Sequence, residues 1–463
     1  MKKQIHFIGI KGVGMTALAL YAKEKGFLVS GSDEAEEFLT DAVLKKHKIS
    51  FKVGFNRKDL KIKPDLVIVT GAHGGLTNKE AQAFREEGVE VISHGQALGR
   101  FLNEQQGISV AGVGGKTTTS AMIATILSNN QLDPSYVVGV ADIFPLGQPG
   151  HFGRGKYFVA EADEYAACPQ SDPTPRFLYQ KPQVEIITNI EYDHPDIYRS
   201  LEETFAAFSS FVENMDEEGL LVINGDNAHN RSFIKTVRKK TQSYGFSPDV
   251  SYQIENVKFQ TGRTKFSLKQ DNLYLGEYEI QVPGKFNVLN ATASIVVGLH
   301  LGLTTQQIKS SLYQFLGTKR RFEFIGDKGK LKIYDDYAHH PSEIKMTLMA
   351  VHEWFPDYKI LCLFQPHTYS RTKSLLNEFA QSFGFADEVI VLPIFASARE
   401  KYDPEFNSSF LTAKINLYHP RAFFEADEKK IIERLQNISE KTIVLTMGAG
   451  DIYKLGPKIL NQI

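Results

Sequence analysis

Short apolar runs alternate with longer segments of mixed polarity along most of this chain. Near the N-terminus, residues 4–10 (QIHFIGI) have the pattern of a buried strand, and residues 15–25 have the pattern of a helix. A glycine turn of Gly9, Gly12 and Gly14 joins the two. Further strands are predicted at 27–30, 65–70 and 89–94, with helices between them. Strands that alternate with helices predict a parallel α/β domain, which we assign to residues 1–105.

The same alternation continues beyond this first domain. Strands are predicted at 107–111, 157–163 and 184–190, followed by a β-rich section at 250–283 and a helix after PGKFN. The pattern changes near 317–321, and apolar strands such as KILCLFQP and EVIVLPI then alternate with helices to the end. We therefore predict an α/β protein of three domains: a Rossmann-like one (1–105), a central one (106–319) and a second Rossmann-like one (320–463). The first strand of the central domain leads into the loop GVGGKT (112–117), which favours the phosphate-loop ATPase type.

Composition narrows the classes of function without choosing one. The chain has 463 residues, of which 42% are apolar, and its formal net charge is -1, which gives no basic field suited to nucleic acid. Its two cysteines, Cys168 and Cys362, have no metal-ligand spacing and no disulfide pattern. No apolar run approaches the ~20 residues that span a bilayer. We expect a cytoplasmic protein with neither a nucleic-acid partner nor a membrane association.

The stretch SVAGVGGKTTTS (109–120) carries the strongest chemical signal. Glycines, a lysine and threonines follow an apolar strand, although only two residues separate Gly112 from Gly115-Lys116, where the standard phosphate loop has four. Backbone N–H groups at a helix N-terminus form an anion site, Lys116 adds positive charge, and the Thr117 hydroxyl suits magnesium. The alternative is a tight turn with a solvated lysine. We favour ATP binding, by Gly112, Gly114, Gly115, Lys116, Thr117 and Thr118.

Polar residues end the next two predicted strands. Glu161 and Asp163 close one strand, and residues 189–194 (NIEYDH) close the other. Carboxyl ends of parallel strands meet at one sheet edge, so a carboxylate there can complete the coordination of Mg²⁺. His194 either ligates a cation or caps its loop, and we favour the ligand. The predicted metal set is Thr117, Glu161 and His194.

The N-terminal glycine turn allows two interpretations. Asp33 follows it by about twenty residues, where dinucleotide-binding folds place the residue that binds ribose. Taken alone, this pattern suits an NAD-dependent oxidoreductase. That interpretation does not explain Lys116 or the third domain.

Eight segments together resemble one known family. GIKGVGMTALA, AGVGGKTTTS, VAEADE, NIEYDH, PGKFNVLN, DDYAHHPSEI, FQPHTYSRT and TMGAGDI occur in the order seen in the cytoplasmic Mur ligases of peptidoglycan synthesis. The resemblance covers essentially the whole chain and is strongest to the members that add alanine. It implies ATP- and Mg²⁺-dependent ligation of L-alanine to the lactyl carboxylate of UDP-N-acetylmuramate through an acyl phosphate, by a monomer or homodimer.

Two other functions stay open at this point. One is the related ligase that attaches the tripeptide L-Ala-γ-D-Glu-meso-diaminopimelate to UDP-N-acetylmuramate during cell-wall recycling. That enzyme is resembled by the long segment after Glu164, which is Tyr165 followed by AACPQSDPTPRFLYQKP. The alanine type is favoured by FQPHTYSRT, by FASARE and by the absence of lysine at 203–214. The other is a non-catalytic regulatory protein that binds nucleotide.

The resemblance also implies roles for single residues. Lys116 and His194 would be catalytic, and His339 and Arg371 would hold the incoming amino acid, since an arginine suits its carboxylate. Further ATP contacts would come from Asn287, Asn290, Arg321 and Asp336. The UDP-sugar would contact Gly12, Gly14, Met15, Asp33 and His73, with His94 as a weaker candidate.

Three positions depart from the family pattern. Val113-Gly114 stands where the loop usually carries Thr-His, so a hydroxyl and an imidazole are absent beside the expected γ-phosphate. Phe286 replaces the histidine expected before Asn287, and Thr368 replaces an arginine found in many members. We therefore expect Arg371 to contact the carboxylate of the incoming amino acid.

Overall fold

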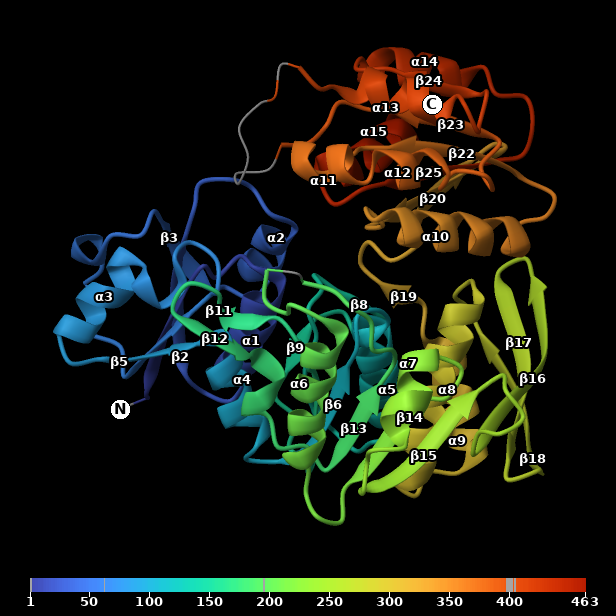
Figure 1. Cartoon of the computed structure of the whole chain (residues 1–463). Coiled ribbons are helices and arrows are strands. Elements are labelled where there is room, and N and C mark those ends of the chain that lie inside the picture. Colours follow the sequence, from blue (N-terminus) through green and yellow to red (C-terminus); the bar gives the residue numbers. More distant parts are fainter. Residues whose placement is uncertain (1, 62, 195, 397–402, 404) are drawn as a thin grey trace. The chain divides into compact units, whose positions relative to one another are not determined.

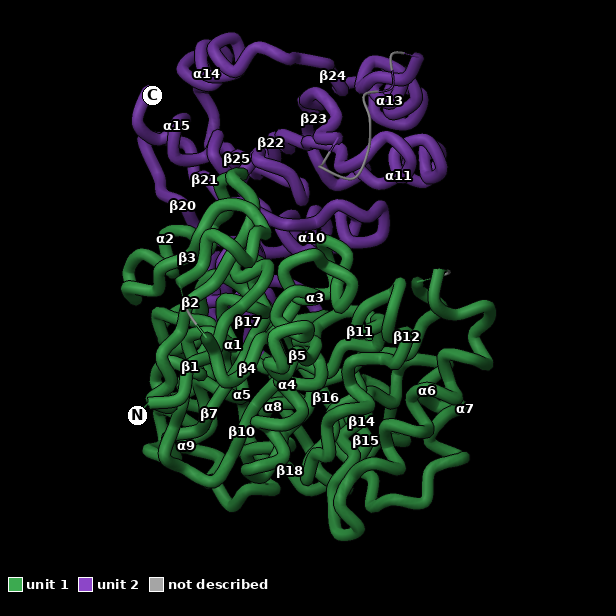
Figure 2. Tube along the Cα trace, turned by 90° about the vertical axis from the view of Figure 1, so that its left-hand side faces the viewer, with its two compact units in different colours: residues 1–257, 266–280, 286–316 green, residues 258–265, 281–285, 317–463 purple. Residues whose placement is uncertain are grey.

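The chain folds into two compact units. The computed structural model describes residues 2–61, 63–194, 196–396, 403 and 405–463 (Figure 1). Unit 1 comprises residues 1–257, 266–280 and 286–316, and unit 2 comprises 258–265, 281–285 and 317–463 (Figure 2). The boundaries of the three predicted domains stay a prediction, because the first two fall within unit 1.

A five-stranded parallel sheet forms the N-terminal part of unit 1, in the order β3-β2-β1-β4-β5. Its central strands are apolar and buried because helices cover both faces. The strands are β1 (Gln4–Ile8), β2 (Leu28–Asp33), β3 (Ser50–Val53), β4 (Leu66–Val69) and β5 (Glu90–Ser93). The helices are α1 (Val13–Glu24), α2 (Leu39–Lys46), α3 (Lys79–Glu86) and α4 (His94–Leu102), with short helices at Arg57–Asp59 and Gly75–Thr77.

A ten-stranded sheet follows, in the order β18-β17-β16-β15-β14-β13-β6-β10-β7-β9. Strands β7 (Ser135–Val137), β10 (Tyr157–Glu161), β6 (Gln106–Ala111), β13 (Val184–Ile187), β14 (Leu220–Asn224) and β15 (Lys240–Gly245) are parallel. The others are β9 (Gly150–His151), β16 (Tyr252–Gln260), β17 (Arg263–Gln270) and β18 (Leu273–Ile280). The helices are α5 (Lys116–Asn129), α6 (Leu201–Glu213), α7 (Ala228–Ile234), α8 (Lys285–His300) and α9 (Thr305–Gln314).

The two sheets of unit 1 share a hydrophobic core. Tyr21 of α1 is fully buried and its ring contacts Phe101 of α4 and Phe158 of β10, with centroids 5.2 and 4.9 Å away. Gly150 of β9 packs so closely on α1 that a Cβ there would lie 1.9 Å from the Ala17 carbonyl oxygen. This packing fixes the N-terminal glycine turn relative to the central sheet.

A small antiparallel hairpin lies between these parts of unit 1. It consists of β11 (Ala166–Cys168) and β12 (Asp172–Pro175), and the short helix Arg176–Tyr179 follows it. The N-terminal part leaves room for it with glycines: a Cβ at Gly71 would lie 2.6 Å from the Ala167 carbonyl oxygen, and one at Gly75 2.9 Å from Cys168 Sγ. The long segment after Glu164 is therefore a structural contact between the two sheets.

Unit 2 contains a six-stranded sheet in the order β20-β21-β25-β22-β23-β24, parallel except for β20. Two apolar clusters pack on its two faces. The strands are β20 (Glu323–Lys328), β21 (Leu331–Asp336), β22 (Lys359–Phe364), β23 (Glu388–Val391), β24 (Ala422–Phe424) and β25 (Thr442–Met447). The helices are α10 (Pro341–Trp354), α11 (Tyr369–Ser374), α12 (Leu376–Ala380), α13 (Ser408–Ile415), α14 (Glu428–Gln436) and α15 (Leu455–Gln462).

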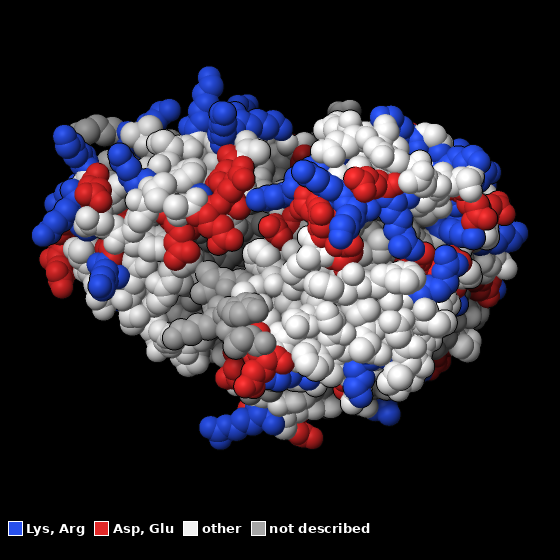
Figure 3. Space-filling model, turned by 90° about the horizontal axis from the view of Figure 1, so that it is seen from above, with Lys and Arg blue, Asp and Glu red and all other residues white. Residues whose placement is uncertain are grey.

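The predicted fold class is confirmed, because the five-, ten- and six-stranded sheets are each built from largely parallel strands with helices between them. Predicted strands end a few residues early where their last residues are polar: 157–163 is observed as Tyr157–Glu161, and 184–190 as Val184–Ile187. None of the described helices is long and apolar enough to cross a membrane. Basic and acidic side chains both occur on the face drawn in Figure 3.

One carboxyl group is buried within the ten-stranded sheet. Glu185 lies in the middle of β13, beside Ser109 of β6 and Leu221 of β14, and is fully buried. Neither of its carboxyl oxygens has a hydrogen-bond partner in the described part of the chain. Burial raises the pKa of Glu185 well above its ordinary value, so the folded chain holds this group protonated.

We predict that Glu185→Leu raises the melting temperature, and more so at pH 8 than at pH 5. At both values the unfolded chain has largely released the Glu185 proton, whereas the folded chain retains it because its pKa is raised, so stability falls as pH rises through this window. The substitution removes that loss, worth about 1.4 kcal/mol for each unit by which the pKa is raised. Thermal melts of both proteins at the two pH values test this. A difference independent of pH would contradict it.

Candidate functional site in the central sheet and unit 2

The loop between β6 and α5 has a conformation that only glycine allows at two positions. Gly112 and Gly115 have φ angles of 121° and 86°. A Cβ at Gly112 would lie 2.3 Å from Thr188 Oγ1, and one at Gly115 would lie 2.6 Å from Asn290 Oδ1. The Gly114 N–H donates to Asn189 Oδ1 at 2.9 Å, which ties the loop to the end of β13. The glycines thus allow the close approach of backbone that an anion cradle requires.

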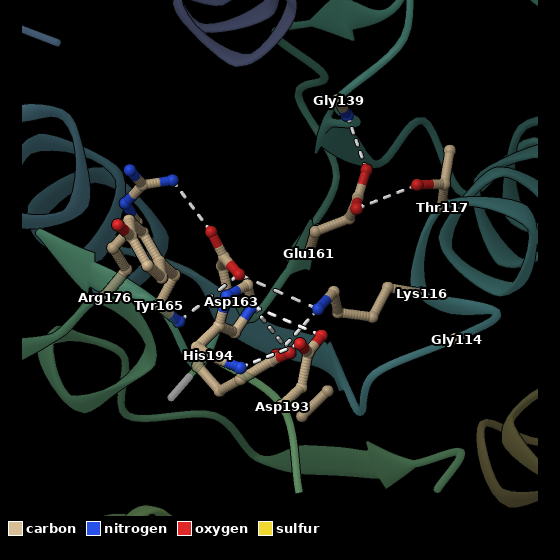
Figure 4. Close-up of polar contacts among 12 residues, drawn as sticks. Gly114, Lys116, Thr117, Gly139, Glu161, Asp163, Tyr165, Arg176, Asp193 and His194 are labelled. Carbon is tan, nitrogen blue, oxygen red and sulfur yellow. Dashed lines mark hydrogen bonds and ion pairs between the residues drawn. The ribbon is translucent and has the colours of Figure 1, made fainter. Parts of the chain in front are cut away.

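Lys116, the first residue of α5, points into a cluster of carboxylates (Figure 4). Its Nζ lies 2.6 Å from Glu164 Oε2 and 3.7 Å from Asp163 Oδ1. Burial opposes the charge of Lys116, but Glu164 and Asp163 outweigh this effect and raise its pKa above the ordinary value. The lysine is therefore held fully charged at the carboxyl edge of the sheet.

Glu161 and Thr117 form a second contact beside this lysine. Thr117 Oγ1 donates to Glu161 Oε2 at 2.9 Å, and the Gly139 N–H donates to the other carboxylate oxygen (Figure 4). Burial raises the pKa of Glu161, opposed by these two donors and by Lys116. A hydroxyl and a carboxylate at the start of a phosphate-type loop are the hard oxygen donors that Mg²⁺ prefers.

His194 lies in a different group of possible ligands from Thr117 and Glu161. Its Nε2 is 3.8 Å from Glu164 Oε1 and 3.6 Å from Asp193 Oδ2, and the ligand atoms of all three residues lie within 4.8 Å of one another. Burial raises the pKa of Glu164, and Lys116 opposes that shift. Lys116 thus stands between a Thr117–Glu161 pair and a Glu164–Asp193–His194 triad. The predicted metal set combined members of both.

Arg176, which the sequence did not single out, adds a second cation. Its Nη1 donates to Asp163 Oδ2 at 2.7 Å, and its guanidinium lies over the Tyr165 ring, 5.7 Å from the centroid. Burial alone would raise the pKa of Asp163, but Lys116 and Arg176 together hold it below its ordinary value. Asp163 therefore connects the loop lysine to the hairpin that contacts the N-terminal sheet.

The two predicted asparagines of α8 lie close to the loop. Asn290 Nδ2 donates to Asn287 Oδ1 at 3.1 Å, and both side chains are buried. The close approach of Asn290 Oδ1 to Gly115 brings this part of α8 to the start of α5. Phe286, next to them, is half-buried.

The N-terminal glycine turn is organised by Asp33. Its two carboxylate oxygens accept the N–H groups of Lys11 at 2.6 Å and Glu34 at 2.8 Å, and the side chain is buried. His73 stands at its edge, with Nε2 4.0 Å from Asp33 Oδ1 and its ring 5.0 Å from that of Phe55. Asp33 thus shapes the turn in addition to the ligand role predicted for it.

Gly12 and Gly14 open α1, and Met15 is buried behind them. His94 faces this helix start: its Nε2 would lie 3.3 Å from a Cβ at Gly14. Burial lowers the pKa of His94 to about 4, and Arg176 acts in the same direction. His94 is therefore neutral at physiological pH.

In unit 2, two adjacent arginines have opposite environments. Arg320 is buried and donates to Asp335 Oδ2 at 2.9 Å and to the Gly448 and Gly450 carbonyls. Arg321 is exposed, with its guanidinium 5.5 Å from the Tyr337 ring centroid. Arg320 thus holds the fold together, whereas Arg321, the residue selected from the sequence, is available to solvent.

Asp336, at the end of β21, is enclosed by backbone donors. It accepts the N–H groups of Phe322 at 2.8 Å and Ala338 at 2.9 Å. Burial raises its pKa to about 6, and Arg321 opposes the rise.

The residues of unit 2 that were predicted to bind the amino acid, His339 and Arg371, both lie beside His367. The ring centroids of His339 and His367 are 6.1 Å apart, and Arg371 Nη1 lies 3.3 Å from His367 Nδ1. Thr368, which replaces the family arginine, adopts φ +67°, a strained conformation for a β-branched residue, and its N–H donates to the Phe395 carbonyl. The strain occurs in the turn that presents Arg371.

Sequence reasoning missed several residues of these sites. They are Asn189, Glu164, Asp193, Arg176 and Glu343. Four of them lie inside the quoted motifs, and Arg176 lies in the long segment after Glu164, but these stretches did not show which side chains turn toward Lys116 or His339.

An open, largely parallel sheet with a lysine-bearing glycine loop at its carboxyl edge defines an α/β protein of the phosphate-loop class. Three family models match in order: the Mur ligase family catalytic domain at residues 4–106, the Mur ligase middle domain at 110–298 and the Mur ligase glutamate ligase domain at 320–450. The chain belongs to the Mur ligase family. The predicted family membership and the prediction of an enzyme, a ligase of this family, are confirmed.

Known proteins similar to this chain carry related names. A UDP-N-acetylmuramate--L-alanine ligase of Desulfitobacterium hafniense is 39% identical over 99% of this chain and 100% of its own. The crystal structure of a UDP-N-acetylmuramate-alanine ligase of Thermotoga maritima has a TM-score of 0.83 at 28% identity and covers 99% and 98% of the two chains. A UDP-N-acetylmuramate:L-alanyl-gamma-D-glutamyl-meso-diaminopimelate ligase from Neisseria has a TM-score of 0.62 at 28% identity, over 69% of this chain and 100% of its own.

We predict that Arg320→Ala destabilises the fold, whereas Arg321→Ala does not. Arg320→Ala leaves the carboxylate of Asp335 buried without its cation, so we expect a loss of about 3–5 kcal/mol in unfolding free energy. Arg321→Ala removes an exposed side chain and leaves the melting temperature unchanged. Thermal and denaturant unfolding of both variants test this, and equal destabilisation by the two would contradict it.

Proposed function

We propose that this chain joins L-alanine to the lactyl carboxylate of UDP-N-acetylmuramate, with ATP converted to ADP and phosphate. The observation that carries the proposal is the fully charged Lys116 at the carboxyl edge of the central sheet, in a chain 39% identical to an enzyme of that name. The lactyl carboxylate attacks the γ-phosphorus and ADP leaves. The amino group of alanine then attacks the acyl carbon of the resulting acyl phosphate, and phosphate leaves.

Charge is the central difficulty of the first step. A carboxylate and a triphosphate repel each other, so the site must supply positive charge where they meet. In the proposal Lys116 exchanges Glu164 for phosphate oxygens, and the N–H groups around Gly112, Gly114, Gly115, Thr117 and Thr118 bind the phosphates. No nucleophile of the protein is required.

The donor set beside Lys116 fits Mg²⁺. Thr117 and Glu161 supply a hydroxyl and a carboxylate, and His194 with Glu164 and Asp193 supplies a second group of donors. When bound, Mg²⁺ would neutralise phosphate charge. The two groups of donors lie on opposite sides of Lys116. In this proposal the phosphates bind beside that lysine.

The remaining ligand roles follow the predicted residues. Asn287 and Asn290 would bind adenine, and Arg321 and Asp336 would contact the phosphates and ribose of ATP. Gly12, Gly14, Met15, Asp33 and His73 would bind the UDP-sugar at the start of α1. His339 and Arg371 would hold L-alanine.

The other functions considered above have less support. The alanine ligase of Thermotoga maritima is more similar in fold than the tripeptide ligase from Neisseria, with TM-scores of 0.83 and 0.62, and an alanine ligase is 39% identical over 99% of this chain. A purely regulatory protein has less support because the chain belongs to a ligase family and is 39% identical to a relative named as a ligase. We also propose that the protein acts in the cytoplasm, where UDP-sugars and ATP occur together.

Phosphate release tests the proposal. The protein is incubated with ATP, MgCl₂ and UDP-N-acetylmuramate, together with L-alanine, glycine, L-serine or the tripeptide. Release that is greatest with L-alanine supports the proposed function. Release only with the tripeptide supports the recycling ligase, and release with none of the four rejects the enzymatic proposal.

We predict that Lys116→Ala lowers turnover at least about 100-fold, because it removes the cation that offsets the charge of the reacting phosphate. Lys156→Ala, at the opposite end of β10, is the matched control and keeps normal turnover. Phosphate release measures activity, and thermal melting establishes that both variants are folded. Normal turnover in Lys116→Ala would remove this residue from catalysis.

We predict that Arg371→Ala raises the KM for L-alanine about tenfold or more, with the KM for ATP unchanged, because a charge-assisted contact to the substrate carboxylate is lost. Arg321→Ala serves as the reciprocal control and raises the KM for ATP. Steady-state kinetics with each substrate varied in turn distinguish the two. If Arg371→Ala leaves the KM for alanine unchanged, Arg371 is not its carboxylate contact.

A further inference from the structure

A histidine and a glutamate of unit 2 form a pair with a defined proton position. His339 Nδ1 lies 3.1 Å from the Tyr337 carbonyl oxygen and 3.4 Å from Glu343 Oε2. Both neighbours accept hydrogen bonds, so the proton of the neutral ring resides on Nδ1. The lone pair is then on Nε2, which has no hydrogen-bond partner among the described residues.

Glu343 is itself held in place. It lies in the first turn of α10, and its Oε2 accepts the N–H groups of His339 at 3.1 Å and His340 at 3.2 Å. Burial would raise the pKa of Glu343, but His339 and Arg321 hold it below its ordinary value, so the carboxylate is ionised. A glutamate that caps a helix and also contacts an imidazole fixes the orientation of that imidazole.

The residues beside His339 suit the two charged groups of an α-amino acid, its carboxylate and its amino group. His367 lies between His339 and Arg371, 6.1 Å from the first by ring centroid and 3.3 Å from the second by Nδ1 to Nη1. The carboxylate and the amino group of an α-amino acid are attached to the same carbon atom. An amino acid whose carboxylate binds Arg371 therefore presents its amino group to the imidazoles beside it.

The second half of the proposed reaction requires a proton acceptor. Free amino acids carry an ammonium group at neutral pH, and this nitrogen has no lone pair until it loses a proton. We propose that Nε2 of His339 accepts that proton and that Glu343 is the positioning residue that keeps Nε2 available. One proton moves from the ammonium nitrogen to Nε2, the C–N bond forms, and the C–O bond to phosphate breaks with its electron pair on phosphate. The nitrogen then loses a second proton, which the departing phosphate takes, and the amide results. The inference rests on the proposed function.

The charges around His339 suit this role. Burial lowers its pKa, Arg371 of α11 and Arg321 act in the same direction, and Glu343 of α10 opposes them. The Tyr337 carbonyl and the His367 ring are the other polar groups that face it. The ring is thus neutral at physiological pH and can act as a base.

A nucleophile that carries no extra proton tests whether His339 acts only in accepting the proton of alanine, because it needs acyl phosphate formation but no proton acceptor. Hydroxylamine is largely unprotonated at neutral pH, and it converts an acyl phosphate into a hydroxamate without a base. We expect His339→Gln to lower L-alanine-dependent turnover at least about 100-fold, while hydroxamate formation from ATP and UDP-N-acetylmuramate stays within a few-fold of the unaltered protein. Equal loss in both assays, or no loss with alanine, would overturn the proposal.

Glu343→Gln provides a readout that a purely structural role would not change. The carboxylate raises the pKa of His339, so its loss shifts the acidic limb of the pH profile of kcat to lower pH. His340→Asn is the matched control: it alters the exposed neighbour, retains a good helix cap and keeps the profile unchanged. A uniform fall in kcat without a shift would assign Glu343 to structure alone.

The two proposals fail in different ways. If the unaltered protein releases no phosphate with L-alanine, the proposed function is wrong. If the unaltered protein is active and His339→Gln remains active with alanine, only the role of His339 is wrong.

Discussion

The candidate site of unit 1 depends on one constraint, the parallel arrangement of β10, β6 and β13 in adjacent positions. Their carboxyl ends bring three loops to one edge: the glycine loop after β6, the carboxylates after β10 and the segment Asn189–His194 after β13. Antiparallel order would place one of these loops at the opposite edge. Chemistry spread over about eighty residues of sequence is thus gathered by strand order alone.

Burial of charge at this edge is tolerated because opposite charges are paired. Lys116 is surrounded by carboxylates, and the pKa shifts of Asp163 and Glu164 differ in direction because Asp163 also contacts Arg176. Removing Lys116 from Glu164 would leave a buried carboxylate unpaired, which is costly unless another cation replaces it. Phosphate and Mg²⁺ arriving together would meet this requirement, since one takes the lysine and the other takes the carboxylates.

The fold class was predictable from the sequence, and so were the segments that surround Lys116 in the structure, but not the contact that each side chain makes. Apolar periodicity locates strands and glycine spacing locates turns, because both reflect the local backbone. Which carboxylate turns toward Lys116 depends instead on packing between distant segments: Glu164 contacts the lysine directly, whereas Glu161 is engaged by Thr117 and Gly139. Similarly, only burial distinguishes Arg320 from Arg321, and burial is set by the loop at Gly448 and Gly450, more than a hundred residues away.

The departure at Val113-Gly114 has a structural counterpart. Where the family usually carries Thr-His, this loop has no polar side chain, yet the Gly114 N–H is fixed by Asn189 and the Gly114 carbonyl accepts a hydrogen bond from the Thr188 hydroxyl. Residues at the end of β13 therefore fix the conformation of the loop, and the backbone N–H donors of the loop are preserved. In the proposed reaction, positive charge at the γ-phosphate then has to come from Lys116 and the metal rather than from a loop imidazole. In that proposal, the charged network around Lys116 would carry more of the electrostatic stabilisation than the family pattern alone implies.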